Sequence, residues 1–205
     1  MAYLGILLTI SGALLLSLIS PGPNFIIVTS TAMTISRKAG VLIGLGLAAA
    51  SCTWTLLAVC GLALIVINGG WLYFAIKLVG AIYLIVLGVK MVFGARKPLP
   101  QSLGVQGAGG LAAMRKGFIV SMTNPKSVAF YGSIFALLVP AHAPIWLYVA
   151  IVIISTFLSA LWYCGLALLF SQGPVRQAFE RFRSVVETTM GLFLVGLGGR
   201  ILVNR

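Results

Sequence analysis

The sequence predicts an all-α, polytopic membrane protein with six transmembrane helices. Of its 205 residues, 60% are hydrophobic and 8% are charged, and the mean hydropathy is +1.13. Soluble domains carry about 25% charged residues, and a soluble fold cannot hide this much apolar surface from water. The apolar residues are gathered in segments of about 20 residues or more, the length that crosses a bilayer core. We expect residues 1–205 to form one transmembrane domain.

The six predicted spans are separated by short polar segments. They cover residues 3–36, 39–67, 72–93, 117–139, 145–170 and 188–203. Residues 94–116, rich in Gly, Pro and Gln, are predicted to form a loop. Residues 174–187 are predicted to form a short amphipathic helix on the membrane surface.

Basic residues indicate how the spans are oriented. The formal net charge is +12, from 14 Lys and Arg against 2 acidic residues. Lys and Arg lie in alternate loops, whereas the loops at residues 68–70 and 140–144 carry none. The positive-inside rule places the basic loops, including residues 94–116, in the cytoplasm and both chain ends outside. Nucleic-acid binding would need a basic face on a soluble scaffold, so none is expected.

The two halves of the chain share a pattern that indicates an internal repeat. At identical spacing, the third span has Tyr83-Leu84, Leu87-Gly88 and Lys90, and the sixth has Phe193-Leu194, Leu197-Gly198 and Arg200. Two three-span units, residues 1–93 and 117–205, must run in opposite directions because three is odd. This predicts a 3+3 inverted-topology repeat. The alternative is chance recurrence of Gly and Leu in membrane helices.

Helices 1 and 4 are predicted to be broken, because prolines interrupt both spans. In the first span, Pro21 and Pro23 lack a backbone N–H, so carbonyls one turn earlier lose their donors. A membrane tolerates such backbone only where it is buried in protein or lines a watery cavity. Free carbonyls suit an ammonium group, and a helix restarting near Asn24 suits a carboxylate. Together with Gly22, this segment fits a zwitterion such as an amino acid. A purely structural kink is the alternative.

The fourth span contains the matching break, Asn124-Pro125-Lys126. A charge well inside a span is costly and is usually functional. Lys126 is expected either to hold a substrate carboxylate or to pair with the free carbonyls of the site, and snorkelling to the interface is the structural alternative. Tyr83, Tyr131, Trp162 and Tyr163 are further candidates to line a cavity, although aromatic side chains at membrane helix surfaces more often pack or anchor the helices.

Little other chemistry is visible in the sequence. Glu187 opens the predicted sixth span, where it either caps the helix through the helix dipole, the favoured reading, or carries a coupling proton. The 3 Cys residues lie in apolar runs without metal-binding spacing, so no metal or cofactor is expected. The sequence contains no HExxH, G-x-S-x-G or P-loop signature, which argues against a protease or an ATPase.

These motifs resemble the lysine exporter / homoserine–threonine resistance superfamily of amino-acid exporters. The resemblance covers nearly the whole chain. Its motifs are Pro21-Gly22-Pro23, Gly80-x-x-Tyr83-Leu84-x-x-Leu87-Gly88 and Asn124-Pro125-Lys126, and Ser36-Arg37-Lys38 with Tyr131-Gly132-Ser133-Ile134-Phe135 resembles the threonine-efflux branch. The resemblance implies a bacterial inner-membrane exporter of small amino acids driven by the proton gradient. Many members carry an acidic residue in place of Asn24, which implies that coupling here uses Glu187 or no carboxylate.

We therefore expect secondary active efflux of a neutral, polar amino acid such as threonine or homoserine, with protons and the lipid bilayer as partners. Lysine, arginine or another neutral amino acid is an alternative substrate. A lipid-handling membrane enzyme would need an acid–base or nucleophile pair, which we do not find. A channel would need a ring of filter residues, and uphill export that collapses with an uncoupler would separate a carrier from a channel. The many Gly residues suit close helix packing within one chain or in a homodimer.

Overall fold

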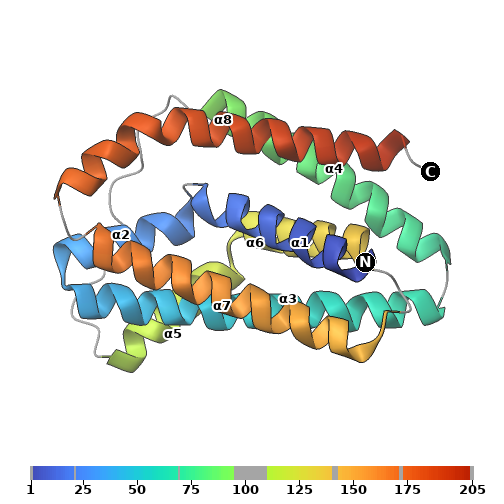
Figure 1. Cartoon of the computed structure of the whole chain (residues 1–205), viewed down its shortest axis with the longest axis horizontal. Helices are drawn as coiled ribbons and strands as arrows, with labels where there is room; N and C mark the ends of the chain where they lie inside the picture. The colour runs from blue at the N-terminus through green and yellow to red at the C-terminus, as the bar shows by residue number, and fades with distance from the viewer. Residues whose placement is uncertain are drawn as a thin grey trace.

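The computed structural model is an elongated bundle of helices (Figure 1). It describes residues 2–20, 22–68, 70–94, 110–139, 143–170 and 173–203, which form helices and no strand. The helices of these residues are α1 (Ala2–Ile19), α2 (Pro23–Thr34), α3 (Arg37–Asn68), α4 (Gly70–Gly94), α5 (Gly110–Met122), α6 (Pro125–Leu138), α7 (Ile145–Leu169) and α8 (Gly173–Val203). The all-α class predicted from the sequence is confirmed.

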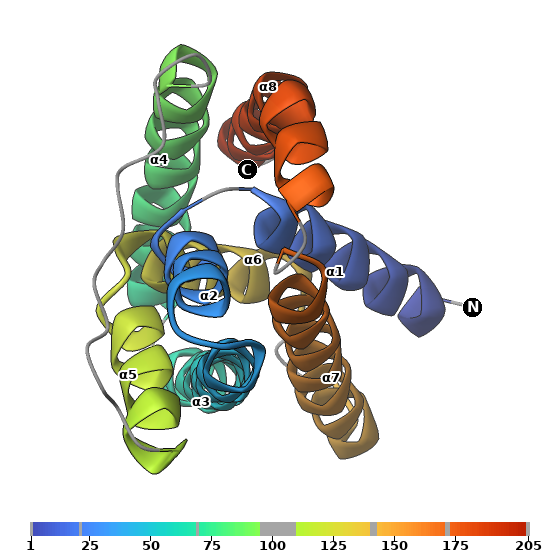
Figure 2. The same ribbon diagram turned by 90° about the vertical axis from the view of Figure 1, so that its left-hand side faces the viewer.

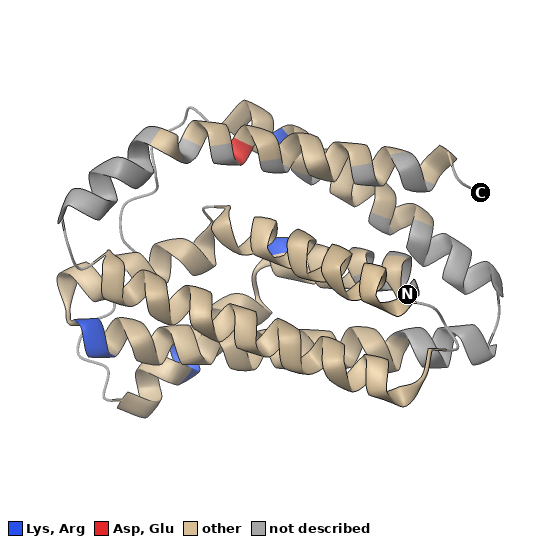
Figure 3. Ribbon diagram, viewed as in Figure 1, with Lys and Arg blue, Asp and Glu red and all other residues tan. Residues whose placement is uncertain are grey.

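Several of these helices have the length and composition of membrane spans. Within the described residues, Arg37–Gly61 of α3 and Ile145–Leu169 are each long and apolar enough to cross a bilayer. Helices α1 and α2 would together make a third span, bent by 54° where they meet. Charged residues are sparse along the described helices (Figure 3). These features support a multi-pass membrane protein, while the number of six spans and the inverted repeat stay predictions.

The first interruption of the chain follows from proline chemistry. Helix α1 ends at Ile19, and Ser20 N donates to Leu16 O at 3.3 Å as the turn closes. Helix α2 begins at Pro23, in the first turn, where a missing N–H costs nothing. Gly22 precedes it in an extended conformation, and the Gly22 carbonyl accepts the first helical bond from Ile26 N at 2.9 Å.

The second interruption is built in the same way. Helix α5 ends at Met122 and α6 begins at Pro125. Asn124 caps α6, because its side-chain Oδ1 accepts from Lys126 N at 3.0 Å and its carbonyl accepts from Ser127 N at 2.9 Å. An Asn-Pro pair therefore specifies a helix start in the middle of an apolar segment.

Two sequence predictions about element boundaries are wrong. Residues 174–187 do not form a separate surface helix, because α8 runs without a break from Gly173 to Val203. After Pro174, which a first turn tolerates, this stretch contains no Gly or Pro to stop the helix. Of the predicted loop at residues 94–116, residues 110–116 belong to α5, and residues 95–109 lie outside the described part.

The helices pack as a main bundle with a helix pair on one side. Helices α4 and α8 lie against each other, whereas α3 packs along α7 and α5 (Figures 1 and 2). Small residues allow the close approach of α4 and α8. A Cβ atom on Gly88 would lie 2.4 Å from the Gly191 carbonyl oxygen, and a Cβ on Gly191 would lie 2.5 Å from that of Gly88.

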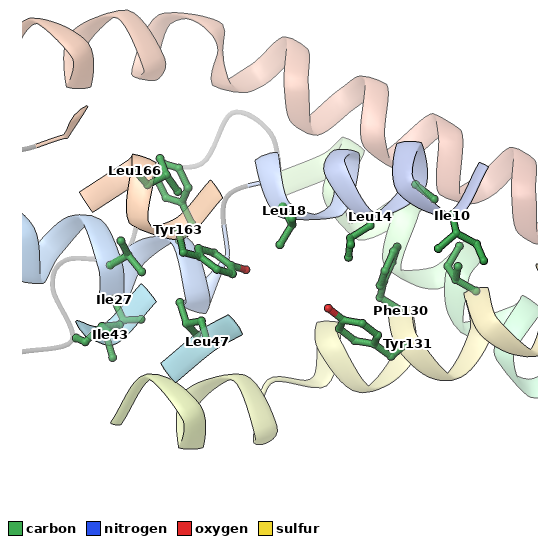
Figure 4. Close-up of a cluster of buried hydrophobic side chains, with 14 of the residues drawn as sticks. Ile10, Leu14, Leu18, Ile27, Ile43, Leu47, Phe130, Tyr131, Tyr163 and Leu166 are labelled. Atoms are coloured by element: carbon green, nitrogen blue, oxygen red, sulfur yellow. The ribbon is translucent and has the colours of Figure 1, made fainter. Parts of the chain in front are cut away.

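The main apolar core surrounds the interruptions. Buried side chains from α1, α2, α3, α6 and α7 form one cluster, which includes Leu14, Ile27, Leu47, Phe130 and Leu166 (Figure 4). This packing surrounds the ends of α1, α2, α5 and α6. Backbone polar groups that lack helical partners at those ends therefore lie inside protein rather than against lipid.

Candidate substrate-binding site

A small polar cavity lies where the two chain interruptions meet. Its volume is about 30 Å³, enough for water but not for an amino acid in this conformation. Its lining combines hydroxyl, amide and ammonium groups with a few apolar side chains, and its polar members are Ser17, Ser20, Asn24, Ser51, Ser121, Asn124, Lys126, Ser127, Tyr131 and Tyr163. The hydroxyls of Tyr131 and Tyr163 point toward each other in Figure 4.

Asn24 is at the centre of the polar groups. Asn124 Nδ2 donates to Asn24 Oδ1 at 3.0 Å and joins the two interruptions directly. Asn24 Nδ2 faces three hydroxyl oxygens, those of Ser121 (3.3 Å), Tyr163 (3.3 Å) and Ser127 (3.5 Å). An amide nitrogen has two hydrogens, so at most two of these acceptors are satisfied at once. The third hydroxyl can turn toward a molecule in the cavity.

Lys126 supplies a donor that the proline removes from α1. Its Nζ donates to the carbonyl oxygens of Ser17 at 3.2 Å and Ser20 at 3.1 Å. In an uninterrupted helix the Ser17 carbonyl would accept from the amide of residue 21, which is proline. The ammonium group also compensates the negative end of the α1 dipole. Of the predicted roles for Lys126, pairing with the free carbonyls is the one seen, and snorkelling is wrong.

Glu187 is the carboxylate associated with this lysine. Its side chain is only 5% exposed, and it interacts electrostatically with the Lys126 ammonium group. The favoured reading of Glu187 as a helix cap is wrong, because it lies about four turns after the start of α8. From the sequence we predicted that the last span begins with the apolar run at residue 188, whereas α8 begins at Gly173.

The other predicted site residues fall into three groups. Gly22, Asn24, Asn124, Lys126 and Tyr131 line the cavity. Tyr83 does not line it, but its Oη donates to the Pro125 carbonyl at 3.0 Å and so contacts the second interruption. Pro23 and Pro125 start helices next to the cavity, and Pro21 lies outside the described residues.

The sequence analysis missed the serines of the site. Ser121 and Ser127 lie three residues before and three residues after Asn124, and both are buried against Asn24. Ser121 is further held by Trp54, whose Nε1 donates to the Ser121 carbonyl at 3.3 Å. No local pattern in the sequence singles out these serines, because the chain is interrupted between Met122 and Pro125 and they meet Asn24 only through tertiary packing.

Apolar helices, paired interruptions and a buried polar cavity between them are the features of a membrane transport protein. The comparisons agree with this class. The family described as LysE type translocator matches residues 15–205, and the chain belongs to this family. Its members are translocators, so the protein is a transporter rather than an enzyme.

Relatives align with nearly the whole chain. The threonine efflux protein of Escherichia coli K12 is 30% identical over 207 residues, which cover 97% of this chain and 98% of the relative. The threonine efflux protein of Salmonella typhi is 29% identical over 203 residues, covering 96% and 97%. An uncharacterized membrane protein of Escherichia coli K12, YahN, is 29% identical over 186 residues, covering 89% and 82%. No solved structure matches the chain.

Proposed function

We propose that the protein exports a neutral, polar amino acid such as threonine or homoserine across the bacterial inner membrane. Membership of the translocator family and similarity to threonine efflux proteins support amino-acid export. The observation that carries the proposal is the polar cavity between two interrupted segments, which offers main-chain carbonyls and amide groups side by side. A zwitterion needs this combination of acceptors and donors.

The geometry of the cavity gives each part of such a substrate a counterpart. The carbonyl oxygens of Ser17 and Ser20 accept from an ammonium group. The substrate carboxylate is expected to meet Lys126 and the nearby starts of α2 and α6, where the helix dipoles are positive. A side-chain hydroxyl fits the surrounding amide and hydroxyl groups, which include Asn24 and Tyr163.

The charges of the cavity favour a neutral side chain. The described residues that line it include one ammonium group and no carboxylate. A lysine or arginine substrate would bring a further positive charge into this confined space, whose described lining holds no carboxylate. We therefore favour threonine and homoserine as substrates over lysine and arginine, which the sequence left open as alternatives.

Transport requires that the cavity open alternately to each side. The cavity is too small for an amino acid in this conformation, and rocking of one three-span half against the other would enlarge and open it. The contact of α4 with α8 supports such a two-fold arrangement, since Leu84 and Leu194, which the internal repeat equates, are buried in one cluster. In this scheme the basic loops are cytoplasmic and both chain ends are outside.

We further propose that the proton gradient drives export. The side chain of Asn24 has no titratable proton. Glu187 is a buried carboxylate that interacts electrostatically with Lys126 of the cavity. Glu187 is therefore the candidate for proton coupling. An uncoupler that abolishes uphill export would separate this mechanism from a channel, which moves its substrate only downhill.

The direct test is export of labelled threonine from loaded cells that express the protein. Pro23→Ala and Lys126→Ala should reduce export strongly, because the first restores a donor inside the break and the second removes the only ammonium of the described cavity lining. Lys90→Ala is a matched control, since Lys90 is an exposed lysine of α4. Export at the parental rate by both site variants would show the mechanism to be wrong.

A further inference from the structure

The end of α1 forms a site for a primary ammonium group, and Lys126 already occupies it. Its Nζ lies 3.2 Å from the Ser17 carbonyl oxygen and 3.1 Å from that of Ser20. The last carbonyls of a helix lack intrahelical donors and carry the negative end of the dipole. Both serines and Lys126 line the cavity. The ammonium group of a bound amino acid would meet the same carbonyls.

Two ammonium groups cannot share this site. Both carry the same charge and only donors, so they compete for the same two oxygens and repel each other. The substrate can bind there only after the Lys126 side chain has moved away. Two negative groups can stabilise the displaced lysine. One is Glu187, which is buried on α8 and interacts electrostatically with Lys126, and the other is the carboxylate of the substrate.

We propose that Lys126 is an internal stand-in for the substrate ammonium group: it fills the Ser17–Ser20 carbonyl site in the empty carrier and yields it to the substrate. This inference rests on the proposed function. It assigns to Lys126 a role in the step in which the empty carrier returns to bind the next substrate. Without an ammonium at the site, the closed carrier would bury two carbonyl groups without donors, which is costly inside a membrane. The loaded carrier avoids this cost, because the substrate satisfies them.

The experiment compares net efflux with exchange in proteoliposomes that contain the Lys126→Met variant. Methionine keeps most of the side-chain length and removes every donor. Net efflux of labelled threonine, which needs the empty carrier to return, should fall about tenfold or more, since the empty closed carrier would bury two carbonyl groups without donors. Exchange against saturating unlabelled threonine should fall much less than net efflux, because the carrier is always loaded and saturation offsets the weaker binding of the substrate carboxylate. Lys90→Met should change neither.

A binding measurement tests the site without transport. Lys126→Ala leaves room at the α1 carbonyls, so methylammonium should raise the melting temperature of this variant. Tetramethylammonium, which has no N–H donor, should not. Neither ion should stabilise the Lys126→Met protein, whose side chain fills the space, or the parent, whose lysine occupies it. If Lys126→Ala is recovered only partly folded, methylammonium present during solubilisation should restore it, and failure to do so counts against the site.

The outcomes separate the inference from the proposed function. An equal fall of exchange and net efflux in folded Lys126→Met protein, or retention of both, would overturn the stand-in role. Absence of any methylammonium effect on Lys126→Ala would overturn the ammonium site. If the parent exports no amino acid while methylammonium still stabilises Lys126→Ala, the proposed function fails and the site stands. If the parent exports threonine and the methylammonium effect is absent, only the inference fails.

Discussion

The side-chain amides of Asn24 and Asn124 meet at 3.0 Å, one from each interruption of the chain. Each residue also has a local task. Asn124 caps α6 through the amide of Lys126, and Asn24 holds hydroxyl groups from α5, α6 and α7 around the cavity. The pair therefore ties the helix starts to each other and to the cavity wall.

Asn124→Ala should destabilise the protein in two ways. Loss of the α6 cap costs about 1 kcal/mol, and loss of the donor to the buried Asn24 oxygen costs about 1–3 kcal/mol. Asn124→Ser keeps a capping oxygen but is too short to reach Asn24. Its loss of stability should therefore be smaller than that of Asn124→Ala by the roughly 1 kcal/mol that the cap contributes. Thermal unfolding of the purified proteins in detergent measures both. Equal losses in the two variants would contradict the capping role of Asn124.

Gly88→Ala should weaken the packing of α4 against α8. The added Cβ would lie 2.4 Å from the Gly191 carbonyl oxygen, so the helices must separate. Overpacking of this kind costs about 1–3 kcal/mol, and Gly191→Ala should behave alike, because its Cβ would lie 2.5 Å from the Gly88 oxygen. Gly196→Ala is the control, since nothing lies within 4 Å of its Cβ. Melting temperatures that are unchanged in Gly88→Ala would place the two helices further apart than described here.

Part of this arrangement followed from the sequence and part did not. The prolines at positions 21, 23 and 125 predicted where backbone groups lose their partners, because the missing N–H is a local property. The partner of Lys126 was left open between a substrate and free carbonyls, since it depends on how α6 lies against α1. The serines around Asn24 were missed because serine is common in membrane helices, and only tertiary packing distinguishes Ser121 from the rest.

Tyr163→Phe should affect substrate binding more than stability. Asn24 Nδ2 has three hydroxyl acceptors for its two hydrogens, so removal of the Tyr163 hydroxyl leaves enough acceptors and should cost less than about 1 kcal/mol. A substrate that uses this hydroxyl should bind about fivefold more weakly, the equivalent of about 1 kcal/mol. The KM of threonine efflux and the melting temperature measure the two effects. Asn24→Leu removes the whole amide and serves as the comparison. An equally large drop in melting temperature in Tyr163→Phe would contradict the claim that Asn24 has more acceptors than it can use.

Glu187→Gln should uncouple export from the proton gradient. The substitution removes the one titratable group of Glu187 and the charge that compensates Lys126, but keeps the size of a side chain that is 5% exposed on α8. Uphill export of threonine should be lost, while downhill efflux and exchange should continue. Glu187→Asp, which retains the carboxylate, should keep uphill export at a reduced rate. The measurement is threonine accumulation in proteoliposomes with and without an imposed pH gradient. Gradient-driven accumulation by Glu187→Gln at the parental level would remove Glu187 from the coupling mechanism and leave it as the electrostatic partner of Lys126 alone.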